Sequence, residues 1–212
     1  MGTSQEKSGK PQEQPNEFYK ESRRQPVWHV IVLTSFTFLL YSLVWFCKNW
    51  KQLRNFARER EGEQQVWPEA QAVLERLKTC NPYLFTLLLP IPLVNMVIST
   101  RFFADIVRIS PGSPESIKQH PIAFGIFITA VMSALVLGFK SLPGLFFLLF
   151  LTASLPLALV QHMLNQFWKL VEPPDLIVRQ AFSVTELVTL IIGSLWLGLV
   201  VVGYMTGMST TH

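Results

Sequence analysis

Apolar residues gather in five long stretches of the chain, with polar residues between them: 27–47, 82–100, 121–139, 144–168 and 185–205. A helix rises about 1.5 Å per residue, so roughly 20 apolar residues are needed to cross a hydrocarbon core. The pattern predicts an all-α, polytopic integral membrane protein with four or five transmembrane or re-entrant helices. We expect one helical membrane domain over residues 27–207.

Polar sequence precedes and interrupts this domain. Residues 1–26 are rich in charge and proline, which predicts a disordered polar tail. Residues 48–81 form an amphipathic loop with helical periodicity, in which Trp50, Leu53 and Phe56 fall on one side. Pro68 suits the first turn of a second short helix in that loop.

The second apolar stretch contains two prolines at its middle, Pro90 and Pro92. Each removes a backbone donor and breaks or kinks a helix. Residues 82–100 are therefore predicted to form either a kinked span or a re-entrant pair of short helices. Asn95, one turn beyond Pro92, is expected to bond a carbonyl freed by this hinge.

The last stretch has a clear helical start. Ser183 and Glu186 have the spacing of a capping box, in which each side chain bonds the other residue's backbone N–H. Small residues four apart, such as Ser194 with Gly198 and Gly203 with Gly207, permit close helix packing in lipid.

Charge is sparse and uneven, because only 15% of residues are charged and few Lys or Arg follow residue 120. If residues 82–100 are re-entrant, the positive-inside rule is better satisfied, which favours four full passes plus a re-entrant segment. Basic residues that flank membrane segments account for the +4 net charge. We therefore expect the lipid bilayer, and no nucleic acid, as a partner.

Candidate chemistry is limited to a polar cluster at the end of the fourth apolar stretch: Gln161, His162, Asn165 and Gln166. Polar groups at membrane depth are functional candidates. Either they line a pocket with a titratable histidine, or they are an interfacial helix end that meets water. Elsewhere, Asp105 shares a helix face with Arg101 and Arg108, which predicts an interfacial ion network.

No sequence motif for catalysis, cofactor binding or metal binding occurs in the chain. Cys47 and Cys80 form no CxxC pair and no metal-ligand set with the histidines. We therefore expect no enzymatic activity, no cofactor and no metal.

Several segments resemble an uncharacterised family of small bacterial polytopic membrane proteins. That family shows an aromatic LYxxYWFYKNWK-type motif, and residues 39–54 read LLYSLVWFCKNWKQLR. The similarity continues in NPYLFTLLLPIPLVNMV, in LPLALVQHMLNQFW and in FSVTELVTLIIGSLWLGL. It implies an integral membrane protein, in the cytoplasmic (inner) membrane if bacterial, and carries over no catalytic residue.

The leading functional expectation is a non-enzymatic structural, assembly or partner-binding membrane component, whose partners are other membrane proteins or a second copy. The alternative is a small transporter or channel, with a pocket near the broken second stretch and the polar end of the fourth. Against transport, no internal repeat is visible, and no acidic residue lies near the middle of an apolar stretch, where it could couple an ion.

Overall fold

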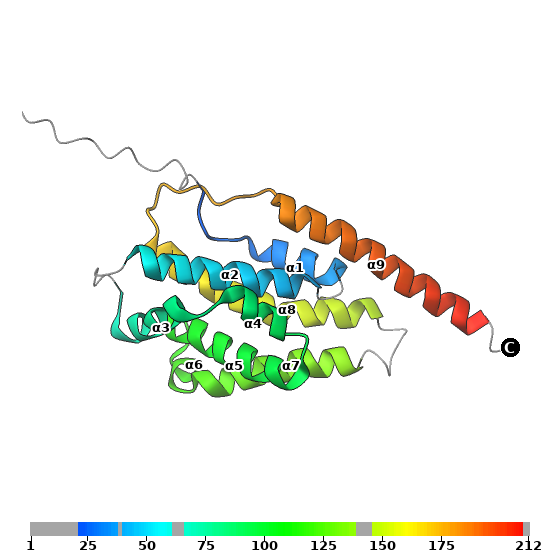
Figure 1. Cartoon of the computed structure of the whole chain (residues 1–212), viewed down its shortest axis with the longest axis horizontal. Helices are drawn as coiled ribbons and strands as arrows, with labels where there is room; N and C mark the ends of the chain where they lie inside the picture. Colours follow the sequence, from blue (N-terminus) through cyan, green and yellow to red (C-terminus); the bar gives the residue numbers. More distant parts are fainter. Residues whose placement is uncertain (1–20, 38–39, 61–65, 139–145, 210–212) are drawn as a thin grey trace, which may run out of the picture.

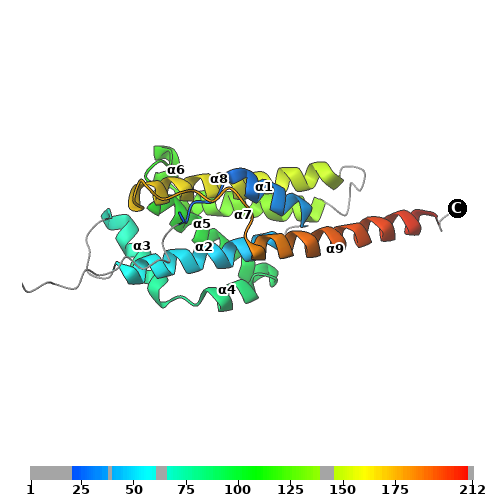
Figure 2. The same ribbon diagram turned by 90° about the horizontal axis from the view of Figure 1, so that it is seen from above.

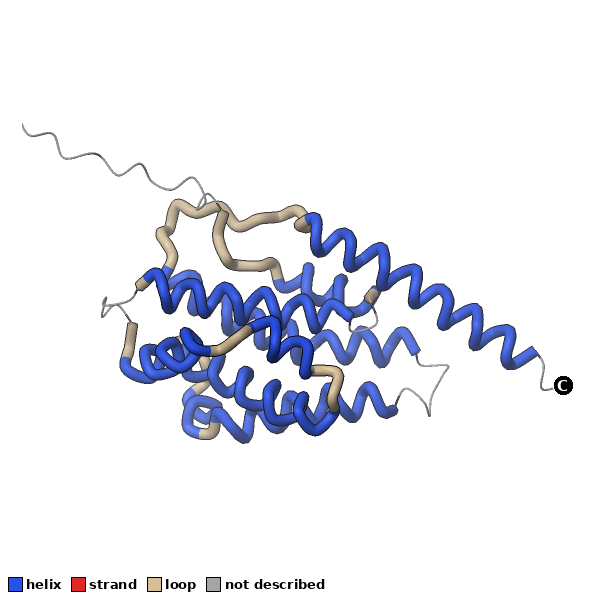
Figure 3. The backbone as a smooth tube through the Cα atoms, in the orientation of Figure 1, coloured by secondary structure: helices blue, strands red, loops and turns tan. Residues whose placement is uncertain are grey.

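The computed structural model describes residues 21–37, 40–60, 66–138 and 146–209. Within these ranges the fold is all-α, as predicted (Figure 3). The β-structure of the described residues consists of one isolated parallel bridge between Glu21 and Ile177. The helices are α1 (Val27–Phe36), α2 (Leu40–Glu59), α3 (Pro68–Thr79), α4 (Pro82–Leu88), α5 (Pro92–Ile109), α6 (Glu115–Gln119), α7 (Pro121–Gly138), α8 (Phe146–Val171) and α9 (Val184–Ser209).

The first apolar stretch is a hairpin of two helices, which corrects the prediction of a continuous segment over 27–47. α1 ends at Phe36, and α2 begins at Leu40 and runs back beside it (Figure 1). The break lies at Thr37, whose backbone N–H donates to Leu33 and whose hydroxyl accepts from the backbone N–H of Tyr41. One threonine thus ends α1 and caps the start of α2.

The predicted disordered tail also requires a correction at its end. Residues 1–20 lie outside the described residues, whereas 21–26 are fastened to the helices. The backbone N–H of Arg23 donates to Glu172 at 2.7 Å, and that of Gln25 donates to Asn165 at 3.1 Å. These side-chain acceptors fix a segment whose composition alone gave no sign of order.

The second apolar stretch forms two helices that double back on each other, so it is a pair of short helices and not one kinked helix. α4 ends at Leu88, Pro92 occupies the first turn of α5, and α5 runs back beside α4 (Figure 1). Proline suits this position because the first helical N–H groups have no intrahelical partner.

Aromatic side chains from α2, α4, α5 and α8 form the centre of the core. Trp50 lies between two rings, stacked on Phe85 at 4.8 Å and on Phe102 at 4.7 Å between ring centroids. Phe56 meets Phe167 and Trp168 edge to face. The amphipathic face predicted over residues 48–81 is therefore packed on the rest of this protein.

α7 and α8 lie side by side with α5, while α9 leaves the bundle after contacting α1 and α2 (Figures 1 and 2). None of the helices, over the residues described, has both the length and the apolar character needed to cross a membrane.

Candidate functional site

The charged cluster at the start of α9 contains Glu186, one of the few buried carboxylates among the described residues. Its local geometry is the predicted capping box: Ser183 N–H donates to the Glu186 carboxylate at 2.8 Å, and Glu186 N–H donates to Ser183 Oγ at 3.2 Å. The reciprocal bonds satisfy backbone donors at the helix start. The capping box therefore sets both the first residue of α9 and the position of the carboxylate.

Two cations meet this carboxylate from different parts of the chain. Lys48 Nζ lies 2.9 Å from Glu186 Oε1, and Arg179 Nη2 lies 2.6 Å from Oε2. The Glu186 side chain is 1% exposed, and the two cationic side chains are about a quarter exposed. Burial lowers the pKa of Lys48, while the charge of Glu186 acts in the opposite direction. The ion pair with Glu186 thus favours the charged form of Lys48 at a position where burial of an unpaired ammonium group would be costly.

Gln25 connects this charged cluster to α2. Its side-chain amide donates to Tyr41 Oη and, at 3.2 Å, to Glu186, and its amide oxygen accepts from Lys48 Nζ at 3.1 Å. Gln25 is 2% exposed. A buried amide needs such partners, because unpaired polar groups are costly in an interior.

The predicted polar cluster divides into two pairs. Gln161 donates to Asn165 at 2.8 Å and accepts from Trp45 Nε1 at 2.6 Å, and Asn165 donates to the Gln25 carbonyl at 2.7 Å. His162 and Gln166 form a separate pair, with 3.0 Å between their side-chain nitrogens, and His162 is exposed. Only the first pair joins the network around Gln25, so the four residues do not line one pocket.

The predicted hinge residues Pro90, Pro92 and Asn95 lie at the turn between α4 and α5. The Oδ1 of Asn95 accepts from Ser99 Oγ at 2.6 Å, one turn further along α5, and no bond from its Nδ2 to a carbonyl of the turn is seen among the described residues. The N–H groups of Leu89 and Ile91 close the turn instead, by donating to Thr86 and Leu88.

Asp105 makes part of the predicted ion network and has an additional partner, while Arg101, the other predicted partner, forms no ion pair with it among the described contacts. Asp105 pairs with Arg108 at 3.4 Å and also with Arg76 of α3. Burial raises the pKa of Asp105, and the neighbouring arginines act to lower it. The pairing with Arg76 joins α3 to α5, and the sequence spacing gave no sign of it.

The chemistry available at the α9 cluster is ionic and structural. Its carboxylate is occupied by Lys48, Arg179 and Ser183 N–H, and within the described part of the chain no group of His, Cys, Asp or Glu could hold a metal ion. No family model, curated protein or solved structure matches the chain. The resemblance of residues 39–54 and of the three later segments to a family of membrane proteins therefore stays a prediction.

Proposed function

We propose that the protein is a non-enzymatic integral membrane component, which holds α9 at a fixed position on a helical bundle and presents it to lipid and to partner helices. The observation that carries this proposal is the exposed apolar surface of α9. Leu195 and Leu199 are each 67% exposed, and Trp196 is 53% exposed. Contiguous apolar surface of this kind marks a membrane or protein interaction site.

The distribution of charge supports the same placement. Residues 27–47, 82–100, 121–139 and 187–212 contain no Asp, Glu, Lys or Arg. Several helix ends lie on the same side of the molecule in Figure 1. They are the end of α1 and the start of α2, the turn between α4 and α5, the C-terminal end of α7, the N-terminal end of α8, and the C-terminal end of α9. We therefore place this end in the hydrocarbon, with α1–α2 and α4–α5 as re-entrant hairpins and the charged end in water. Lys140, between α7 and α8 in the sequence, is the one charged residue that this placement assigns to the apolar end.

The packing of α9 supports a role in partner binding. Near its start, Gly193 packs directly on Thr37, where an added Cβ would lie 2.5 Å from the Thr37 Cα. Further along, an added Cβ at Gly198 or Gly203 meets nothing within 4 Å. The bundle therefore holds the first part of α9 and leaves small-residue positions open in the second, where another helix could approach closely.

The transport alternative receives less support. Gln161 and Asn165, two of the residues predicted to line its pocket, are bonded to Trp45 and Gln25. Those bonds occupy the groups that a passing solute would need. We therefore keep transport as the second candidate.

The membrane placement can be tested with spin labels in proteoliposomes. Cys47 and Cys80 are replaced by serine, and single cysteines are introduced by Leu93→Cys on α5, Leu199→Cys on α9 and Glu75→Cys on α3. We expect labels at the first two positions to be relaxed more by oxygen than by a water-soluble nickel chelate. The Glu75 label is the control, and it should show the opposite preference. Nickel access at Leu199 equal to that at Glu75 would contradict the placement.

The partner role needs a separate measurement in native membranes. A photo-crosslinking amino acid at Leu199, which is exposed, should form defined products with a second copy or another membrane protein. The control is the same amino acid at Leu197, which is 7% exposed and faces the bundle. Products of lipid alone from Leu199 would remove the support for partner binding and leave the membrane placement intact.

A further inference from the structure

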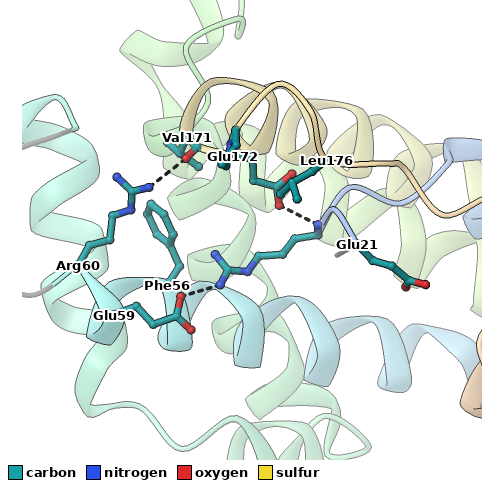
Figure 4. A pocket seen from close by; sticks show the side chains of 9 residues that line it. Glu21, Phe56, Glu59, Arg60, Val171, Glu172 and Leu176 are labelled. Carbon is teal, nitrogen blue, oxygen red and sulfur yellow. Dashed lines mark hydrogen bonds and ion pairs between the residues drawn. The ribbon is translucent and has the colours of Figure 1, made fainter. Parts of the chain in front are cut away.

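A cavity of about 370 Å³ lies at the charged end of the bundle, away from the cluster at α9. Its walls come from the end of α2, the end of α8 and the segment before α1 (Figure 4). Ligand pockets typically have volumes of about 300–1,000 Å³, so this space suits a small polar molecule or a lipid headgroup.

Two arginines approach the same aromatic ring in this cavity. The guanidinium carbon of Arg23 lies 5.6 Å from the centroid of Phe56, and that of Arg60 lies 5.3 Å from it. Arg23 comes from the segment before α1 and Arg60 from just beyond α2, as Figure 4 shows for Arg60 and Phe56. Guanidinium groups bind phosphate through paired N–H donors. Both groups also have partners within the protein, since Arg60 donates to the Val171 carbonyl at 3.3 Å and Arg23 pairs with Glu59 at 2.7 Å, so a phosphate oxygen held by this wall would share the two guanidinium groups with these partners.

Carboxylates stand on the same walls. Glu59 pairs with Arg23 at 2.7 Å, and Glu172 accepts from Arg23 N–H at 2.7 Å and from Ser22 Oγ. Glu21 also lines the cavity. A free anion in this space would meet the carboxylates, and a free cation would meet the arginines, each at a cost that grows as water is excluded.

We propose that this cavity binds a zwitterionic group that joins a phosphate to an ammonium, as in a phosphoethanolamine headgroup. The phosphate would face Arg60 and Arg23, and the ammonium would face the carboxylates of Glu59 and Glu21, because the Phe56 ring is already covered by the two guanidinium groups. Such a ligand matches both signs on the walls, which neither phosphate nor an amine alone can do.

A lipid and a free phosphoamine are the two sources of such a group, and two exposed apolar residues adjoin lining residues in the sequence. Leu176 lines the cavity, and Ile177, the next residue, is 74% exposed. Leu170, which precedes the lining residue Val171, is 62% exposed. Neither Ile177 nor Leu170 lines the cavity, so the acyl chain of a lipid would have to leave the cavity along a path past them. The headgroup chemistry does not depend on that path or on the proposed function of α9.

The test is a binding titration on the full-length protein in detergent, with four probes: glycerophosphoethanolamine, lysophosphatidylethanolamine, inorganic phosphate and ethanolamine. We expect both zwitterions to bind, and Arg60→Gln and Glu59→Gln each to weaken them about tenfold or more, because a bond to a charged group is lost. Arg58→Gln is the matched control: Arg58 is exposed, bonds the Lys78 carbonyl and does not line the cavity.

Each outcome decides a part of the proposal. Tighter binding of the lysolipid assigns a lipid source, and equal binding of the two zwitterions assigns a free phosphoamine. Phosphate binding as tight as zwitterion binding would overturn the proposal, as would affinity unchanged in Arg60→Gln. Thermal melting of each variant, followed by circular dichroism, confirms that it is folded before it is titrated; if Glu59→Gln is unfolded, Arg60→Gln alone decides.

Discussion

Replacing Glu186 by glutamine tests whether the buried ion cluster fixes α9 to the bundle. The substitution keeps the shape of the side chain and removes its charge, which leaves Lys48 and Arg179 next to each other without a counter-ion. Removing one partner of a buried ion pair costs about 3–5 kcal/mol. Because both cations are about a quarter exposed, we place the expected loss near the lower limit, at ~3 kcal/mol.

The matched control is Glu75→Gln. Glu75 also pairs with a lysine, Lys78, at 2.7 Å, but its side chain is 57% exposed. Exposed pairs contribute ~0–1 kcal/mol, so this variant should be almost as stable as the parent. The two substitutions are chemically identical, and each replaced glutamate pairs with a lysine at a similar distance. Any difference between them therefore reflects the burial of Glu186 together with its second cation, Arg179.

The assay is thermal unfolding in detergent, with near-ultraviolet circular dichroism as the signal. For a chain of this length ~1 kcal/mol corresponds to about 2–4 °C, so Glu186→Gln should melt roughly 6–12 °C below Glu75→Gln. Lys48→Met in the Glu186→Gln background should restore part of the loss, because it removes an uncompensated charge. Equal melting temperatures for the two glutamine variants would refute the reasoning, and so would a double variant less stable than Glu186→Gln.

The remaining predictions use the same assay. Gly193→Ala should destabilise the protein by ~1–3 kcal/mol, because its new Cβ overlaps the Thr37 backbone. Gly198→Ala is the control, and it should be neutral or slightly stabilising because its Cβ enters open space. Equal effects of the two substitutions would contradict the packing of α9 on α1. Burial raises the pKa of Asp105, so its protonation stabilises the fold: this contribution is complete below the unfolded pKa, near 3.9, and is lost as pH rises through the higher folded value. The parent should therefore lose stability relative to Asp105→Asn between these two values, and a difference that grows in the parent's favour as pH rises would oppose the assignment.

The long helices could be predicted because their signals are local. The apolar stretch over 121–139 corresponds to α7, Pro121–Gly138, and the capping box places the start of α9. Both features depend on residues a few positions apart, so periodicity and capping chemistry are sufficient. The proline-bounded turn between α4 and α5 was predictable for the same reason.

The break at Thr37 could not be predicted in this way. The residues around it, Thr34 to Phe38, contain neither glycine nor proline. A threonine hydroxyl can cap a helix or point into one, and its local sequence does not choose between them. Packing decides here, because Gly193 lies directly on Thr37 and Gly193 is remote in sequence.

The ion cluster was missed for a related reason. The capping-box interpretation used only the backbone partner of Glu186, and Lys48 was assigned to the flank of a membrane segment. Nothing near either residue indicates that they meet. Of the predicted polar cluster, Gln161 and Asn165 join the buried network because they lie on the inner side of α8, whereas His162, the next residue after Gln161, is exposed.

The pairing of Lys48 with Glu186 also sets an order of events during synthesis. The two residues are 138 positions apart, so at about 5–20 residues per second the lysine waits roughly 7–28 seconds for its carboxylate to be made. Helix formation takes microseconds or less, so α2 can form long before α9 exists. Throughout that interval the nascent chain carries a lysine without the counter-ion that its final position requires. The Lys48–Glu186 ion pair therefore forms only after translation has passed residue 186, and a chain released before that point cannot form it.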